Sequence, residues 1–153
     1  MNDTHKPTKL PDPEAFRHRL RVQLRFNDVD VLGHVNNTVY FSFYDTGKAH
    51  YFGEVRREHM DWNRVETVIA NVECAYISPI FFSEEIDVLT RCIHMGHKSF
   101  TLEQMLVRSD GEIKSICRTV MVSFDPHTGH AIEVPDIWRN AFSDYEPELP
   151  TIQ

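Results

Sequence analysis

The sequence is poor in cysteine, in long apolar runs and in recognisable metal-binding motifs. Its three cysteines, Cys74, Cys92 and Cys117, are far apart and form no Cys-x-x-Cys pair, which argues against a disulfide framework and a zinc knuckle. The nine histidines include no His-Glu-x-x-His motif, so we expect neither a bound metal nor another cofactor. No apolar run approaches the roughly 18 residues that span a bilayer. These absences predict a cytoplasmic protein that does not enter a membrane, with the cysteines as small core residues.

Positive charge is also scarce, and the formal net charge is -7. Nucleic-acid phosphates require a basic face, so the composition argues against nucleic acid as a partner. At 153 residues the chain suits one domain with a sizeable core. We expect a flexible N-terminal arm over residues 1–16, which hold three prolines, a domain over 17–146 and a C-terminal tail over 147–153.

The apolar pattern predicts one long helix and several strands. Residues 21–26 alternate polar and apolar side chains, as a half-buried strand does. Residues 38–53 suit a helix that is apolar around most of its circumference, with a loose continuation to residue 60. Further strands are expected at 65–77, 85–95, 99–108 and 112–124, and a short helix after Pro135. Because the strands follow one another through short turns, we predict an α+β protein in which an antiparallel sheet of five or six strands covers the long helix.

A polar loop between the first strand and the long helix concentrates reactive side chains. Between residues 28 and 40 it holds Asp28, Asp30, Gly33, His34, Asn36 and Asn37. A carboxylate can activate water or attack a carbonyl carbon directly. The free backbone N–H groups at a helix start can hold an oxygen on which negative charge develops. The loop therefore has the parts that hydrolysis at a carbonyl carbon requires.

The segment Arg25–Tyr40 closely resembles the signature of hotdog-fold acyl-CoA thioesterases of the 4-hydroxybenzoyl-CoA thioesterase-like family. The resemblance extends to residues 86–90 through 98–100 and to 131–135, and it covers essentially residues 18–140. It implies a hotdog fold, in which the sheet wraps around the central helix.

The resemblance also implies roles for individual residues. The second aspartate of the Asp-x-Asp pair, Asp30, would be the catalytic carboxylate, acting as general base or as nucleophile. The amide at Asn37 would polarise the thioester carbonyl, and Gly33 would let the loop backbone come close to the thioester.

Two further implications concern the nucleotide and the assembly. The polar segment His97, Lys98 and Ser99 would lie near the nucleotide end of coenzyme A, with the lysine as a phosphate contact. The family implies a homodimer with sites at the subunit interface, often paired into a tetramer. A solvated turn is the competing interpretation of residues 97–99.

Several loop residues also have ordinary structural interpretations. Asp28 is expected to brace the turn. His34 can act as a second base or hold the loop by hydrogen bonds. Asn36 and Asn37 can cap the helix or touch substrate, and Tyr40 can be helix core or line an acyl pocket.

The leading functional hypothesis is an acyl-CoA thioesterase. An acyl carrier protein thioesterase is one alternative, but the motif of such enzymes has asparagine where this chain has Leu32. The other is a protein that binds acyl-CoA without hydrolysing it, which an intact Asp30 argues against. The sequence leaves open the acyl preference and the choice between dimer and tetramer.

Overall fold

The computed structural model describes residues 9–59 and 66–150. Its strands are β1 (His18–Val22), β2 (Thr67–Tyr76), β3 (Ile86–Met95), β4 (Ser99–Arg108), β5 (Ile113–Asp125) and the two-residue β6 (His130–Ala131). Its α-helices are α1 (Val39–Arg56) and α2 (Asp136–Tyr145), and short 3-10 turns occur at Pro13–Ala15 and Phe26–Asp28.

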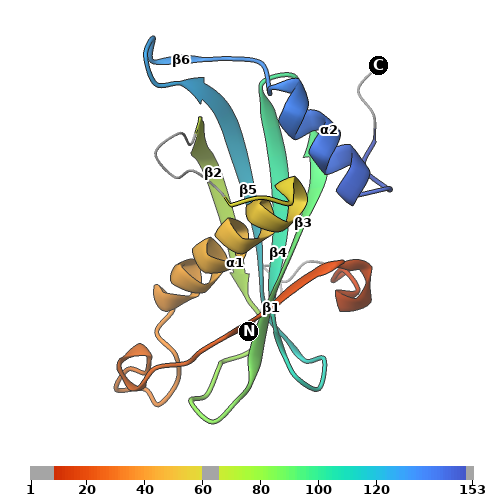
Figure 1. The fold of residues 1–153 in the computed structure, drawn as a ribbon. Coiled ribbons are helices and arrows are strands. Elements are labelled where there is room, and N and C mark those ends of the chain that lie inside the picture. The colour runs from red at the N-terminus through yellow and green to blue at the C-terminus, as the bar shows by residue number, and fades with distance from the viewer. Residues whose placement is uncertain (1–8, 60–65, 151–153) are drawn as a thin grey trace.

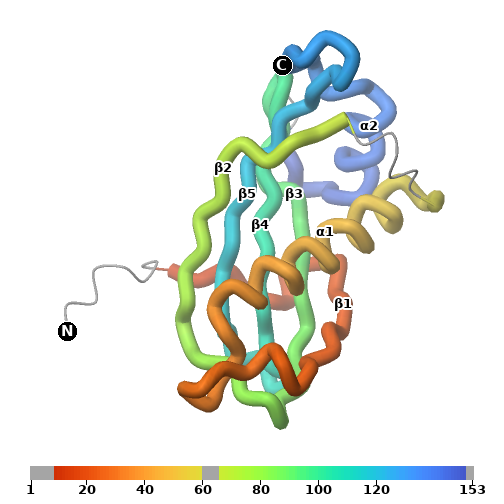
Figure 2. Tube along the Cα trace, turned by 90° about the vertical axis from the view of Figure 1, so that its left-hand side faces the viewer, coloured from red at the N-terminus to blue at the C-terminus, as the bar shows by residue number. Residues whose placement is uncertain are grey.

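One antiparallel sheet in the order β1-β3-β4-β5-β2 forms the body of the molecule, with β6 paired to β5. The sheet curves around α1, which crosses its face, while α2 covers one end (Figures 1 and 2). This is the predicted hotdog arrangement, so the fold prediction is confirmed. Consecutive strands are neighbours from β3 to β5, but β2 pairs with β5 and not with β3.

The helix lies unusually close to the sheet at Gly47. A Cβ atom at this position would stand 2.7 Å from both methyl groups of Val88 on β3. Only glycine permits this approach without displacing the neighbouring side chain. The face of α1 that includes Tyr44 and Tyr51 is buried against the sheet, whereas Asp45 and His50 are exposed.

The predicted bounds of the first strand are wrong, and the long helix ends within its predicted range. The first strand spans residues 18–22 and not 21–26, because its partner β3 begins at Ile86, opposite Val22, and offers no pairing beyond it. The chain then enters the 3-10 turn, which leaves Phe26 82% exposed. The long helix continues past residue 53 to Arg56 and ends where Arg57 takes the left-handed conformation, with φ of 55°. Residue 60, the predicted limit of its continuation, lies outside the described residues.

The outer segments of the chain are partly packed. Residues 1–8 of the predicted arm lie outside the described residues, but Phe16 is buried in a cluster with Leu89 and Met105. Leu149, in the predicted tail, packs against the aromatic end of the core. The domain boundaries stay predictions. Among the described residues, no helix is long and apolar enough to cross a membrane.

Candidate active site

The polar loop that follows the second 3-10 turn, Phe26–Asp28, folds into a tight hairpin. Val29 and Val35 form an isolated antiparallel bridge. Inside it, the Asp30 N–H donates to the His34 carbonyl at 3.1 Å, and the Gly33 N–H donates to the Asp30 carbonyl at 3.0 Å. Gly33 has φ of +87°, a conformation that side chains disfavour. The glycine thus closes the turn that presents Asp30.

The Asp30 carboxylate is oriented by its own loop. Its Oδ1 atom accepts the backbone N–H of Leu32 at 2.9 Å, and its Oδ2 atom accepts the side-chain amide of Asn36 at 3.4 Å. Asp30 is half-buried. Since each carboxylate oxygen can accept more than one hydrogen bond, the group can still accept one from a water or a ligand.

Asp28 has the bracing role that the sequence suggested. Its Oδ2 atom accepts the backbone N–H of Arg25 at 2.8 Å, and its backbone carbonyl accepts the N–H of Asn36 at 2.8 Å. These bonds fix the entry to the hairpin and its exit. The two aspartates of the pair therefore face different partners.

At the start of α1, some backbone N–H groups are hydrogen-bonded and one is not. The side-chain oxygen of Asn36 accepts both the N–H and the hydroxyl of Thr38, at 2.9 and 2.7 Å, and the Asn36 carbonyl accepts the N–H of Val39 at 3.0 Å. Asn36 thus organises the helix start. The N–H of Asn37 has no acceptor among the described residues, so it is a free donor at the positive end of the helix.

A pocket of about 310 Å³ brings together four of the eight predicted site residues, namely Asp30, His34, Asn37 and Tyr40. Its lining consists of Asp30, Leu32, His34, Val35, Asn37, Tyr40, Tyr76, Ile77, Ser78 and Pro79. Gly33 shapes the hairpin beside this pocket without lining it.

Tyr76, at the end of β2, is the main residue that sequence reasoning missed. Its hydroxyl donates to the Asn37 carbonyl at 3.0 Å, and its ring lies 4.9 Å from that of Tyr40, between centroids. Burial, together with the neighbouring Cys74, raises the pKa of Tyr76 to about 12. No local sequence pattern identifies Tyr76 as a site residue, because β2 is distant in sequence from the loop and Tyr76 is one of several apolar residues on it. Only the fold shows its position beside the loop.

Two of the three cysteines, Cys92 and Cys117, are buried as expected, and all three are free thiols. Cys74 is half-buried, opposite Cys117 in the register of β2 and β5.

The predicted nucleotide segment is not near this pocket within one chain. His97, Lys98 and Ser99 lie at the turn between β3 and β4, next to α2, whereas the loop lies near the other end of β3, at Ile86 (Figure 1). A strand of this length separates the two by roughly 30 Å. The turn is held by backbone bonds, in which the His97 carbonyl accepts the N–H of Val134 at 2.8 Å. His97 and Lys98 are exposed.

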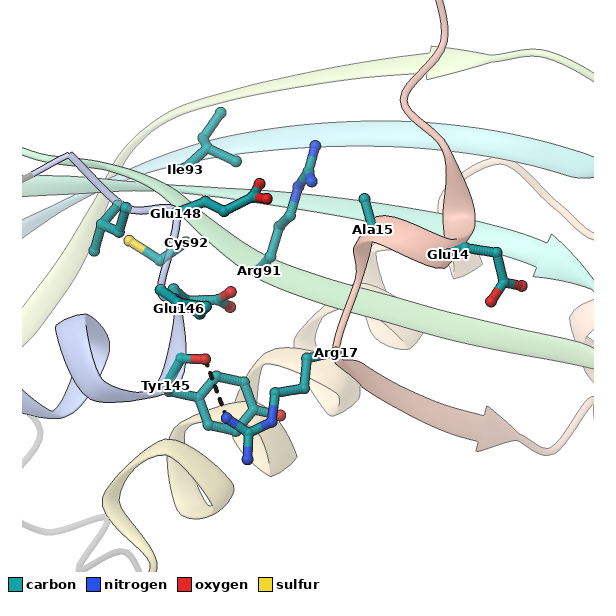
Figure 3. A pocket seen from close by; sticks show the side chains of 11 residues that line it. Glu14, Ala15, Arg17, Arg91, Cys92, Ile93, Tyr145, Glu146 and Glu148 are labelled. Atoms are coloured by element: carbon teal, nitrogen blue, oxygen red, sulfur yellow. Dashed lines mark hydrogen bonds between the residues drawn. The ribbon is translucent and has the colours of Figure 1, made fainter.

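A larger hollow of about 540 Å³ lies at the α2 end and contains none of the predicted site residues. Figure 3 shows Arg17 and Arg91 among acidic side chains. Arg17 donates to the Tyr145 carbonyl at 3.2 Å, and Arg91 forms an ion pair with Glu103 at 2.7 Å. Both arginines of this hollow already have partners within the chain. The hollow is therefore a poorer candidate for the active site than the smaller pocket, despite its size.

Comparisons with known proteins identify the family of this chain. The model of the Thioesterase-like superfamily matches residues 24–142, a range that includes the whole loop. The protein YsmA of Bacillus subtilis (strain 168) is 27% identical over 123 residues, which cover 80% of this chain and 82% of that protein.

Solved structures show the same fold. A thioesterase from Thermus thermophilus, complexed with coenzyme A and Zn, is 30% identical, with a TM-score of 0.80 over 90% of this chain and 99% of that one. The Staphylococcus aureus protein SAV2348, solved with CoA, has the same fold at 15% identity, with a TM-score of 0.77 over 89% of this chain and 87% of that one. With the family model covering most of its length, this chain belongs to the Thioesterase-like superfamily.

Proposed function

We propose that the protein is an acyl-CoA thioesterase that hydrolyses its substrate in the pocket between the loop and the end of β2. The observation that carries this proposal is that Asp30 and Asn37 line one pocket, and that the backbone N–H of Asn37 has no acceptor among the described residues. The coenzyme A in the similar Thermus thermophilus thioesterase supports a coenzyme A thioester as the substrate.

In this proposal the two groups act on opposite sides of the thioester carbonyl. Asp30 either takes a proton from an attacking water or attacks the carbon itself. As the carbonyl oxygen gains negative charge, the Asn37 N–H stabilises it at the positive end of α1. The thiolate of coenzyme A then leaves without needing a strong general acid.

His34 and Tyr40 would complete the pocket. The His34 carbonyl closes the hairpin, and His34 also contributes to the pocket lining. We assign His34 a supporting role and Tyr40 a role in the wall that holds the acyl group. The aromatic pair of Tyr40 and Tyr76 accepts either an aliphatic or an aryl chain, so a substrate panel decides the acyl preference.

We further propose that β2 is covered by a second copy of the chain. This edge strand pairs on one side with β5 and shows no second partner strand among the described residues. Val68, Ile69 and Val72 on it are 44%, 48% and 38% exposed. Exposed apolar edge strands favour pairing with another chain. In an antiparallel pair related by a two-fold axis, the β3–β4 turn of one copy would move towards the loop end of the other. Residues 97–99 would then meet a bound nucleotide only in a homodimer or a larger homo-oligomer.

Release of free thiol from a panel of acyl-CoAs tests the proposed activity. Asp30→Asn and Asp30→Ala should lower kcat by about 10²–10⁴-fold, the range for a general acid or base. Asp28→Asn is the matched control, since this acid braces the turn, and it should retain most of the activity. His34→Ala should lose less activity than Asp30→Ala.

The alternatives predict different outcomes. Thiol release from acyl carrier protein thioesters but not from acyl-CoAs would support the carrier protein hypothesis. Binding of acyl-CoA with no release of thiol would indicate a binding protein. Asp30 variants as active as the unchanged protein would reject Asp30 as the catalytic group. Light scattering that finds an active monomer would contradict the proposed assembly.

A further inference from the structure

Three potential metal ligands meet between β1 and the second half of α1. The side chains of His18, His50 and Glu54 each offer a ligand atom, and these atoms all lie within 4.8 Å of one another. His18 Nε2 is 2.8 Å from His50 Nδ1. Within residues 9–59 and 66–150, this is the one cluster of three or more His, Cys, Asp or Glu side chains with such spacing.

The backbone fixes the arrangement from two directions. His50 and Glu54 are four residues apart on α1, so they lie on the same face, one turn from each other. His18 projects from β1, the edge strand that contacts this helix. All three ligands therefore lie on regular secondary structure, so no loop has to become ordered to bring them together.

His18 lowers the stability of the fold at this position. It is 1% exposed, and its Nδ1 atom has no hydrogen-bond partner among the described residues. A buried histidine that is not fully hydrogen-bonded lowers stability and calls for an explanation. Its other nitrogen, Nε2, faces His50 and is the one in position to bind an ion. The two groups opposite it, His50 and Glu54, are exposed, so an ion can reach the cluster from solvent.

Neighbouring aromatic residues orient the cluster. The Tyr145 hydroxyl donates to Glu54 Oε2. The Tyr51 ring meets the His18 ring edge-on, with 5.4 Å between centroids. Supporting contacts of this kind direct metal ligands in known sites.

We propose that His18, His50 and Glu54 bind a divalent transition-metal ion, with Zn²⁺ as the ion to test. Two imidazole nitrogens and one carboxylate oxygen are a ligand set that zinc accepts, with water in the remaining position. Ligand atoms on tetrahedral zinc lie about 3.3 Å apart, so small movements of the exposed His50 and Glu54 side chains suffice. The prediction of no metal rested on the absence of a sequence motif, and these ligands come from separate elements.

The site is distinct from the proposed active site. Tyr40 and Glu54 lie fourteen positions apart on the same helix, which corresponds to roughly 20 Å along its axis. A bound ion would connect β1 to α1 and would therefore raise the stability of the fold. The proposal therefore does not depend on thioesterase activity.

The test uses the full chain without a histidine tag, after treatment with a chelator. Calorimetric titration with Zn²⁺ should show binding of one ion per chain, and the midpoint of thermal unfolding should rise. Co²⁺ in place of zinc should give the visible absorption of a nitrogen- and oxygen-ligated ion. His50→Ala and Glu54→Gln should each weaken binding by about 100-fold, because loss of a ligand exceeds the effects of supporting residues. His130→Ala, an exposed histidine on β6, is the matched control and should bind as the unchanged chain does.

Two outcomes would overturn the proposal. One is the absence of Zn²⁺ and Co²⁺ binding to the chelator-treated chain. The other is binding that both His50→Ala and Glu54→Gln leave unchanged, which would place the ion elsewhere. Both side chains are exposed, so circular dichroism should confirm that the variants fold.

Discussion

The two ends of α1 meet very different surroundings. At its N-terminal end, a hairpin held by backbone bonds forms one wall of a pocket, and Val31 and Leu32 at its tip are 101% and 73% exposed. At its C-terminal end, the helix enters a dense group of rings. Besides the helix residues Tyr51 and Phe52, this aromatic cluster contains Phe100, Trp138, Phe142 and Tyr145.

Polar groups are treated differently at the two ends. Within the aromatic cluster, the Tyr51 hydroxyl donates to Glu146 at 2.8 Å and accepts the N–H of Cys92 at 2.9 Å. At the loop end, the Asn37 N–H is left without an acceptor among the described residues. Asn37 is exposed, so water can satisfy this donor until a substrate takes its place. The comparison indicates that the aromatic end supplies stability and that the loop end keeps a donor available for chemistry.

The largest expected effect on stability is at Phe142. This side chain is fully buried among the rings of Tyr51, Phe52, Phe100 and Trp138. Phe142→Ala should lower the free energy of unfolding by about 3–5 kcal/mol, because it leaves a cavity. Urea unfolding measures this change. Thiol release per folded molecule should stay near that of the unchanged chain.

Ile137, 58% exposed on the same helix, provides the control. Ile137→Ala should change the stability by less than about 0.5 kcal/mol. If the kcat of folded Phe142→Ala fell as far as that of Asp30→Asn, the aromatic end would also take part in catalysis. That result would contradict the separation of stability and chemistry between the two ends of α1.

A smaller effect on stability, coupled to activity, is expected at Lys114. This lysine is 1% exposed, forms an ion pair with Glu84 at 3.0 Å, and donates to the Pro79 carbonyl in the pocket wall at 2.9 Å. Lys114→Met should destabilise the protein by about 2 kcal/mol, because Glu84 loses one cationic partner and keeps Arg108. Displacement of the wall should also lower kcat/KM by about tenfold. Stability that falls with unchanged activity would show that the wall does not position the substrate.

The same variant should respond differently to acid. Burial alone would raise the pKa of Glu84, but hydrogen bonds from the Phe81 N–H, Arg108 and Lys114 outweigh it and lower the pKa below 4.5. A lowered carboxylate pKa contributes stability above the ordinary value, and this contribution is lost as the pH falls through the folded-state pKa. Below pH 4.5, Lys114→Met should therefore lose stability less steeply than the unchanged chain. Urea unfolding at a series of pH values measures the slope.

The smallest expected effect is at Tyr76. Tyr76→Phe removes the hydrogen bond to the Asn37 carbonyl and keeps the ring. One such bond contributes about 0.5–1.5 kcal/mol, so kcat should fall by about two- to tenfold if the bond holds the Asn37 amide in place, with little change in KM. Tyr76→Leu, which also removes the ring, should raise KM as well. Equal kinetics for Tyr76→Phe and the unchanged chain would remove Tyr76 from the positioning of the amide.

Much of the fold could be predicted because its signals are local. Strand-type residues marked four long strands, and the turn-type pair Asp110–Gly111 lies between β4 and β5, where Gly111 has φ of +92°. The first strand was misplaced because Leu24 and Phe26 continue the apolar alternation beyond the point where a partner strand exists. The alternation of apolar residues shows that a segment can form a strand, but the length of the partner strand decides where that strand ends.

For the candidate site, the sequence by itself determined the loop: an Asp-x-Asp pair, a glycine able to take positive φ and asparagines at the start of a helix are all neighbours along the chain. Only the tertiary structure decided that Tyr76 closes the pocket and that residues 97–99 lie at the far end of the same chain. It alone also brought His18 to His50 and Glu54. The physical reason is that hydrogen bonds in turns and caps join residues a few positions apart, whereas the order of the strands and the packing of α1 join residues that are distant in sequence.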